Sequence, residues 1–343
     1  MKKFSFCIGN PAYQDTSLGE NATFMPPVYD KFLDSAFEIA DKVEMIHPAR
    51  FLFNAGSTPK AWNEKMLNDE HFKVLHYEEN AAAIFPNTDI KGGIAITYRD
   101  RTQRFGAIHV FTKYPELNTI LQKAMPSTEE DSLMSVIYIQ NRLNLKRLYE
   151  TYPDSKATIG SDGKDSRFEK NIFAKLNYVF TEQAIPDSIR TVGIFNNKRT
   201  WRYIPQKYVE AEHANLKKYK VVIPVANGKG EFGETFSTPE LLAPDEAYTR
   251  SFIGIGACST QSEAKAVLSY VKTKFARTML SILKVTQMAN PDVWRYVPKQ
   301  DFTSHSDINW NTSVANIDKQ LYKKYGLSAE EIHFIEKNVK EMV

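Results

Sequence analysis

A short stretch near the amino terminus combines residue types that can hold a planar amine. The apolar run at residues 4–8 breaks into Gly-Asn-Pro-Ala-Tyr, a pattern that predicts a strand ending in an abrupt turn. The side-chain oxygen of Asn10 and the backbone carbonyl of Pro11 are acceptors, and the fixed φ of proline holds that carbonyl in one direction. Tyr13 adds a flat face for stacking. The stretch is therefore either a binding site for an amine-bearing ring or an ordinary strand-to-turn junction with a packing tyrosine.

The elements that must position this stretch follow as alternating helices and strands. Apolar spacing predicts helices at residues 28–40 and 62–67, and strands at residues 43–46, 74–79, 93–99 and 107–111. They predict the second half of a doubly wound, Rossmann-like α/β sheet in a domain at residues 1–111. Ligands of such sheets bind at the carboxyl ends of the strands, where Asn10 and Tyr13 are expected. His47 is either an acid/base group or, more commonly for this position, a histidine packed at a strand end.

The sequence Asn10-Pro11-Ala12-Tyr13 resembles the Asn-Pro-Pro-Tyr catalytic motif of DNA adenine-N6 methyltransferases, with Ala12 in place of the second proline. Segments at residues 28–34, 47–52, 85–93 and 115–121 occur in the same order in type IIG and related single-chain restriction-modification methylases. The resemblance implies a site-specific methyltransferase with Asn10, Pro11 and Tyr13 as catalytic residues. The first two would accept hydrogen bonds from the adenine amine, and the tyrosine would stack on the extruded base. Ser5 stands where relatives often carry aspartate.

The chain resembles only the carboxyl-terminal half of these enzymes. In relatives with this order of motifs, a glycine-rich strand and turn that bind S-adenosylmethionine precede the catalytic strand, whereas few residues precede Asn10 here. The sequences Gly228-Lys229-Gly230 and Gly254-Ile255-Gly256 are too short and lie in the wrong context for such a fingerprint. We therefore expect S-adenosylmethionine to bind to a partner subunit or to a missing amino-terminal half, and we assign no cofactor-binding residue in this chain.

Residues 112–343 differ in character and predict an α+β domain that resembles the target-recognition domain of these enzymes. Residues 190–207 interleave cations with aromatic side chains, a mixture that can contact the phosphates and base edges of double-stranded DNA. The candidate DNA-binding residues are Lys198, Arg199, Trp201, Arg202, Lys272 and Lys274. The alternative for residues 190–207 is a solvated face with aromatic packing beneath it, and helical lysines are usually just solvated.

Local patterns in this second domain predict further elements. Apolar spacing predicts one helix at residues 133–149, and another whose apolar face runs from Val267 to Leu280 and leaves Arg277 largely off that face. Residues 159–167 predict a loop rich in glycine, serine and aspartate. Ser328, followed three residues later by Glu331, predicts a capping box at the start of a carboxyl-terminal helix.

Composition limits the remaining classes of function. The chain has 343 residues, 42% apolar and 25% charged, which suits a soluble globular protein of about two domains. A net charge of +3 is too small to indicate nucleic-acid binding by itself. Cys7 and Cys258 lie far apart without metal-ligand spacing, so we expect buried thiols and no metal. No segment has the apolar length of a membrane span or signal peptide, so we expect a cytoplasmic protein without membrane contact.

Two functions of different classes remain open. The first is the catalytic-loop and DNA-recognition part of a DNA adenine-N6 methyltransferase, completed by a partner that binds S-adenosylmethionine. The second is a DNA-binding specificity subunit or restriction-modification remnant without catalysis. They differ in whether a partner that carries the glycine-rich motif completes a site. A third interpretation is an unrelated α/β protein.

Overall fold

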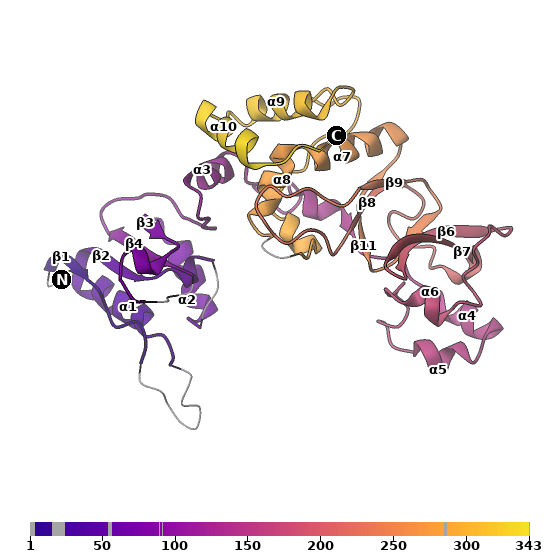
Figure 1. The fold of residues 1–343 in the computed structure, drawn as a ribbon, viewed down its shortest axis with the longest axis horizontal. Coiled ribbons are helices and arrows are strands. Elements are labelled where there is room, and N and C mark those ends of the chain that lie inside the picture. The colour runs from indigo at the N-terminus through magenta and orange to yellow at the C-terminus, as the bar shows by residue number, and fades with distance from the viewer. Residues whose placement is uncertain are drawn as a thin grey trace. The chain divides into compact units, whose positions relative to one another are not determined.

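The computed structural model of the chain describes residues 4–15, 25–53, 57–88, 90, 92–284 and 287–342. The chain divides into two compact units, Met1–Asn118 and Thr119–Val343, called unit 1 and unit 2 below (Figure 1). The division falls within helix α3 (Pro115–Ala124), a few residues beyond the boundary expected after residue 111. None of the helices in the described ranges is long and apolar enough to cross a membrane.

Unit 1 is built on a four-stranded sheet in the order β1-β2-β4-β3. Its strands are β1 (Phe4–Gly9), β2 (Ala40–Pro48), β3 (Phe72–Glu78) and β4 (Ile94–Asp100). Strands β1 and β2 are parallel and flank helix α1 (Tyr29–Ile39), whereas β4 pairs antiparallel with both β2 and β3. Unit 1 is thus a mixed α/β structure in which the Asn10 turn leaves the carboxyl end of a parallel strand.

Helix α1 forms where the apolar spacing predicts it. Tyr29, Leu33 and Ala36 recur at helical spacing and are buried on one side of the helix. The helix ends where Ala40 takes up extended backbone and starts β2 without a loop. Helix α1 therefore leads directly into the strand that pairs with β1.

The helices of unit 1 share one core with one face of the sheet. Helix α2 (Lys60–Leu67) and the 3-10 helix η1 (Arg50–Phe53) join the same apolar cluster as α1 and β2. Cys7 packs against this cluster but is partly exposed, so the prediction that it is buried is wrong. Its alternating neighbours Phe4, Phe6 and Ile8 are 54%, 47% and 71% exposed. Strand β1 is an edge of the described sheet, and the described residues leave its outer apolar face largely open.

Unit 2 contains two sheets. The first has the order β10-β6-β7 and comprises β6 (Ser188–Phe195), β7 (Lys198–Pro205) and β10 (Glu246–Tyr248). The second has the order β5-β11-β8-β9 and comprises β5 (Ile137–Tyr138), β8 (Tyr219–Pro224), β9 (Glu240–Leu242) and β11 (Phe252–Cys258). With unit 1, they make the protein a mixed α/β structure with several sheets.

Each sheet of unit 2 packs with its own group of helices (Figure 1). The short helices α4 (Leu145–Thr151), α5 (Ser155–Ile159) and α6 (Ile172–Lys175) share a core with β6 and β7. Helix α7 (Gln261–Lys272) packs on β8 and β11 and contacts α8 (Lys274–Ser281) and α9 (Val314–Lys324), while α10 (Ala329–Asn338) contacts α8. The remaining 3-10 helices are η2 (Ala81–Ala83), η3 (Leu133–Val136), η4 (Gln206–Tyr208) and η5 (Pro291–Trp294).

Two predicted elements are wrong, because local contacts interrupt them. The strand expected at residues 107–111 does not form: His109 has a φ of +54°, and its N–H donates to the carbonyl of Leu67. The helix expected at residues 133–149 is replaced by η3, β5 and α4. Helix α4 starts only after Asn144, whose side chain accepts a hydrogen bond from the N–H of Arg147. In each case a backbone N–H, of His109 or of Arg147, donates to a different group from the one that the expected strand or helix would offer it.

The carboxyl-terminal helices show one correction and one confirmation. The helix expected to carry Val267 and Leu280 on one face is two helices, because Thr273 caps α8 by accepting from the N–H of Ala276. The capping box at Ser328 and Glu331 is present at the start of α10, as the sequence predicts.

Candidate functional site

The Asn10 turn is anchored between the end of β1 and the start of α1. The carbonyl of Tyr13 accepts a hydrogen bond from the N–H of Val28 at 3.2 Å, and the N–H of Asp15 donates to the carbonyl of Pro26 at 2.9 Å. Asn10 is exposed, whereas Pro11 and Tyr13 are half-buried. The turn therefore presents the Asn10 amide outward from a backbone that the helix start holds in place.

Tyr13 stands beside Asn10 with its hydroxyl shielded from solvent. This hydroxyl meets no partner within hydrogen-bond limits among the described residues. Burial raises the pKa of Tyr13, and the nearby Asn10 side chain offsets part of that rise. The tyrosine is therefore neutral at physiological pH, which argues against an acid/base role for its hydroxyl. The structure thus brings together the three predicted catalytic residues of the turn.

His47 is a packed side chain, which confirms the more common interpretation of its position. It is fully buried, its Nε2 lies 2.7 Å from the Thr97 hydroxyl, and its Nδ1 lies 3.1 Å from the Pro48 carbonyl. Its ring stacks in parallel on Tyr29 at 5.6 Å. Burial lowers the pKa of His47 to about 4, so the ring is neutral at physiological pH. The residue packs between α1 and the sheet and is closed off from solvent.

A second turn lies beside the end of β2. The N–H of Ala49 donates to the carbonyl of Gly93 at 3.0 Å, which joins the end of β2 to the start of β4. Gly93 has a φ of +79°, and a Cβ at this position would lie 2.4 Å from the carbonyl oxygen of Glu78. This residue closes the loop at residues 85–93, of which Asp89 and Lys91 lie outside the described residues.

One buried carboxylate near the turn is not predicted from the sequence. Asp30 lies in the first turn of α1 and is 6% exposed, and its Oδ1 has no hydrogen-bond partner among the described residues. Buried carboxylates are ordinarily paired or hydrogen-bonded. The sequence does contain a signal for it: Asp30 lies next to Tyr29 and three residues before Leu33, so it falls within the buried stripe of an amphipathic helix.

The predicted DNA-binding cations of strand β7 lie together, but most already have partners. Arg199 pairs with Glu240 at 3.0 Å, and Arg202 pairs with Glu182 at 2.8 Å. The guanidinium carbon of Arg190 lies over the Trp201 ring, 3.7 Å from the centre of that ring. Lys198 is exposed and forms no ion pair with any described acidic group. Arg199 and Arg202 are therefore held by carboxylates, whereas Lys198 is held by none in the described part of the chain.

The two predicted lysines of α7 and α8 lie in a different environment. Lys274 starts α8, and its Nζ lies 2.5 Å from a carboxylate oxygen of Glu336 and 3.2 Å from the Glu336 carbonyl. Lys272 is half-buried at the end of α7. Arg277 is only 2% exposed and donates to the backbone carbonyls of Lys272, Glu234 and Lys340. Lys274 and Arg277 thus hold helices and the chain end together, and Arg277, predicted to lie largely off the apolar face, is buried by its contacts with these carbonyls.

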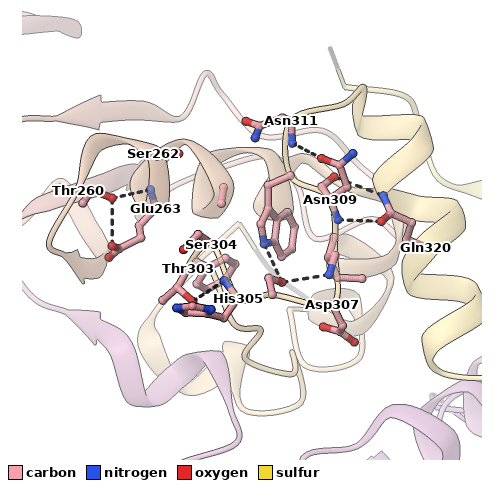
Figure 2. Close-up of a pocket in the computed structure, with 15 residues that line it drawn as sticks. Thr260, Ser262, Glu263, Thr303, Ser304, His305, Asp307, Asn309, Asn311 and Gln320 are labelled. Atoms are coloured by element: carbon pink, nitrogen blue, oxygen red, sulfur yellow. Dashed lines mark hydrogen bonds between the residues drawn. The ribbon is translucent and has the colours of Figure 1, made fainter.

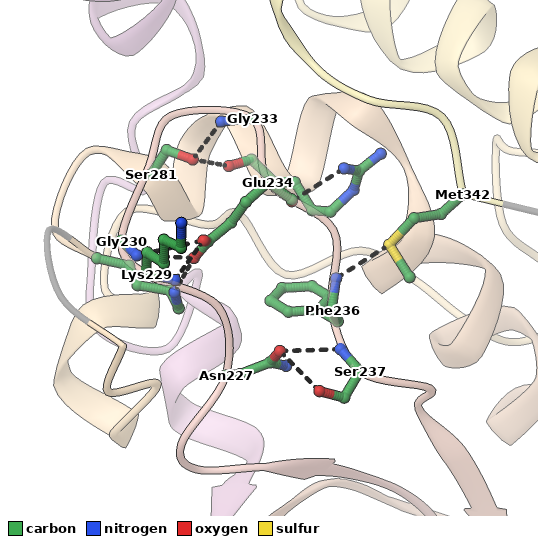
Figure 3. A network of polar contacts seen from close by, with 11 residues as sticks. Asn227, Lys229, Gly230, Gly233, Glu234, Phe236, Ser237, Ser281 and Met342 are labelled. Atoms are coloured by element: carbon green, nitrogen blue, oxygen red, sulfur yellow. Dashed lines mark hydrogen bonds and ion pairs between the residues drawn. The ribbon is translucent and has the colours of Figure 1, made fainter.

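The glycine-containing loop at Gly228 binds a carboxylate of its own chain (Figure 3). The Glu234 carboxylate accepts hydrogen bonds from the backbone N–H groups of Lys229 at 2.7 Å and Gly230 at 3.1 Å, and it pairs with Lys284. Burial tends to raise the pKa of Glu234, but Lys284 and these N–H groups lower it below its usual value. Because Glu234 occupies the N–H groups that would hold a phosphate, the loop is a closed structural element.

A cavity of about 750 Å³ lies in unit 2, between the start of α7 and the loop at residues 302–311 (Figure 2). Its wall includes Trp310, whose indole N–H donates to the Ser306 hydroxyl and the Asp301 carbonyl at 3.0 Å. The Gln320 side chain accepts from the N–H of Asn309 at 2.8 Å. None of the predicted site residues lines this cavity. No group of three His, Cys, Asp or Glu side chains in the described ranges could hold a metal ion.

Comparisons with known proteins bear on these observations. Residues 1–85 match the model of the family described as Eco57I restriction-modification methylase. No curated protein matches the chain. One similar solved structure is the type IIL restriction-modification enzyme MmeI in complex with DNA, with 9% sequence identity and a TM-score of 0.35. Another is the type IIG restriction endonuclease BpuSI, with 12% sequence identity and a TM-score of 0.33. A third is the ATP-dependent type ISP restriction-modification enzyme LlaBIII bound to DNA, with 10% sequence identity and a TM-score of 0.25.

These matches cover most of this chain but a smaller share of each solved structure. They cover 97%, 94% and 92% of this chain, but only 56%, 48% and 29% of MmeI, BpuSI and LlaBIII, respectively. The chain thus spans about half the length of the first two structures.

Proposed function

We propose that the chain is the catalytic-loop and DNA-recognition part of a site-specific DNA adenine-N6 methyltransferase, on the premise that residues 1–85 match the Eco57I restriction-modification methylase family. The observation that carries the proposal is the Asn10-Pro11-Ala12-Tyr13 turn at the carboxyl end of β1, inside the segment that matches the family. This edge of an α/β sheet is the usual place for ligands.

The chemistry needs acceptors rather than a strong base. The exocyclic amine of adenine is a weak nucleophile because its lone pair is delocalised into the ring. Hydrogen bonds from that amine to the Asn10 oxygen and the Pro11 carbonyl favour the localised lone pair that attacks the methyl group. Such fixed dipoles act most strongly on the charge that develops in the transition state. Tyr13 supplies a stacking face for the extruded base.

The S-adenosylmethionine site is proposed to lie on polypeptide that docks beside β1, either on a partner subunit or on a chain segment ahead of this strand. Support comes from the open edge and outer face of β1, where Phe4, Phe6 and Ile8 remain exposed in the described structure. Large apolar side chains that gather on one exposed face mark an interaction surface. In this arrangement unit 1 is the second half of a Rossmann-like methyltransferase sheet, and its parallel β1-α1-β2 connection continues the doubly wound order.

Unit 2 is proposed to recognise double-stranded DNA. The cations and aromatic rings of β6 and β7 support this role, since phosphate neutralisation by lysine and arginine provides most of the non-specific affinity for DNA. Lys274 is paired with Glu336 and its side chain is only 16% exposed, whereas Lys198 on β7 is exposed and unpaired among the described residues, which favours the β6–β7 surface over the α7–α8 junction as the contact region.

The decisive experiment measures methyl transfer and cofactor binding with and without an added amino-terminal half. Calorimetric titration of the isolated chain with S-adenosylmethionine should show no appreciable binding, whereas the complex should bind the cofactor and transfer labelled methyl to DNA. Clear micromolar binding by the isolated chain contradicts the split site.

A matched pair of variants tests the docking surface in the same experiment. Ile8→Thr on β1 should weaken the association of the added half, while Leu75→Thr should leave it unchanged. Leu75 is an equally apolar residue, 47% exposed on β3 at the other edge of the same sheet. Equal effects of the two substitutions would remove β1 from the interface.

A non-catalytic specificity subunit is the second candidate. Ser5 and Ala12 depart from the pattern of the catalytic family, which favours this reading. A complex that binds both DNA and S-adenosylmethionine but never methylates would support it.

A further inference from the structure

We propose that Asn196 and Asn197, at the tip of the β6–β7 hairpin, read base edges in the major groove of duplex DNA. The inference rests on the proposed function, since it names the residues by which unit 2 would select its DNA sequence. It goes further than the candidate cations, whose proposed contacts with phosphates carry no sequence information by themselves.

The turn between β6 and β7 carries two asparagines at positions whose positive φ angles glycine would also adopt. Strands β6 and β7 pair in register from Ser188 opposite Pro205 to Phe195 opposite Lys198, which leaves a two-residue connection. Both connecting residues have positive φ, 50° for Asn196 and 60° for Asn197. This is the conformation of a type I′ hairpin turn, in which glycine commonly takes one position. The choice of asparagine at both positions keeps two side-chain amides at the tip.

These amides are free to bind another molecule. Asn196 and Asn197 are exposed, and neither side chain hydrogen-bonds to the described chain. An asparagine amide matches the donor and acceptor pair that adenine presents in the major groove. A two-stranded β-ribbon also fits the width of that groove.

The ribbon that carries the tip is suited to an anionic partner. The segment Ser188 to Pro205 contains four cations and no acidic residue, so its partner carboxylates all come from outside it. Arg202 lies 5.6 Å from the centre of the Phe195 ring, next to the turn. Lys198 follows the tip directly and is exposed. Cations on the flanks would contact the backbone phosphates while the tip enters the groove, which favours duplex DNA over an acidic protein surface.

The test separates sequence reading from affinity. The full chain is used to select binders from a randomised duplex library, in parallel with an Asn196→Gly/Asn197→Gly variant. Glycine keeps the positive φ of both positions and removes only the amides. The control is Asp187→Gly, an exposed positive-φ position (54°) at the other end of β6. Because this control removes a negative charge, it can only raise affinity for all sequences alike.

The inference expects the double glycine variant to lose about 10- to 100-fold discrimination at one or two base pairs of the selected sequence. Its salt dependence should not change. Lys198→Gln should do the reverse, with uniformly weaker binding and a reduced salt slope. Unchanged base preference in a double glycine variant that binds DNA overturns the inference alone. Failure of the unsubstituted chain to enrich any sequence overturns DNA recognition by unit 2, and this inference with it.

Discussion

Arg199 Nη1 lies 3.0 Å from a carboxylate oxygen of Glu240, and its Nη2 donates to the Thr238 carbonyl at 2.8 Å. The guanidinium, which the sequence predicts to contact DNA, is therefore held by β9 and by the segment before it. Both side chains are about a third exposed, so the pair is open to solvent and to an approaching phosphate. A DNA phosphate must compete with or share this carboxylate.

Removing the carboxylate charge should strengthen DNA binding. Glu240→Gln frees Arg199 for phosphate, and we expect affinity for duplex DNA to rise by up to about 5-fold, because exposed ion pairs are worth about 0–1 kcal/mol. Fluorescence anisotropy at several salt concentrations measures the change. Glu129→Gln makes the same charge change at an exposed glutamate elsewhere in unit 2 and serves as control. Equal gains in both variants would mean that only net charge matters.

Removing the cations should weaken DNA binding. A Lys198→Ala/Arg199→Ala/Arg202→Ala variant loses up to three phosphate contacts, so the slope of log affinity against log salt should become shallower by up to about 3. The matched control replaces Lys146, Arg147 and Lys156, three exposed cations of α4 and α5, by alanine. If only the control variant weakened binding, the β7 surface would not be the interface.

Substitutions in the Asn10 turn should distinguish a catalytic role of this turn from a packing role. In a complex that methylates DNA, Asn10→Ala removes an acceptor and should lower the rate by about 10²- to 10³-fold, with DNA binding little changed. Tyr13→Ala should weaken base stacking, worth about 1–3 kcal/mol, while Tyr13→Phe should be nearly silent. Transfer of labelled methyl, with folding checked by circular dichroism, measures these effects. Full activity of a folded Asn10→Ala complex would end the catalytic assignment.

His47 should make unit 1 sensitive to acid. Burial lowers its pKa from 6.5 to about 4, so the unfolded chain binds the extra proton between these values. The contribution of His47 to stability is complete above pH 6.5 and is lost as pH falls towards 4, by about 2 kcal/mol between pH 7.5 and 5. Hydrogen exchange of peptides from unit 1 measures this change.

Variants at two histidines identify the source of the acid sensitivity. His47→Gln should flatten the pH dependence of exchange in unit 1, whereas His76→Gln, at an exposed histidine of β3, should not. The same pH dependence in both variants would show that other groups titrate.

The sequence by itself determined the features that depend on neighbouring residues. The apolar stripe of Tyr29, Leu33 and Ala36 specifies α1 because residues three and four apart share a helix face. Ser328 and Glu331 specify the start of α10 because the two residues satisfy each other's backbone N–H groups. The break at Asn10 likewise follows from glycine and proline within a few residues. These interactions are complete within one or two turns of chain.

Only the tertiary structure decided which charges are free and where elements stop. Arg277 fits the polar side of a helix by its spacing, yet it is buried because the carbonyls of Glu234 and Lys340 approach it from distant parts of the chain. Arg199 is paired because Glu240 on β9, a strand of the other sheet, lies within reach of its side chain, and sequence spacing does not reveal that neighbour. Partners separated by many residues are chosen by packing of whole elements, since each side chain binds the group that folding brings within reach.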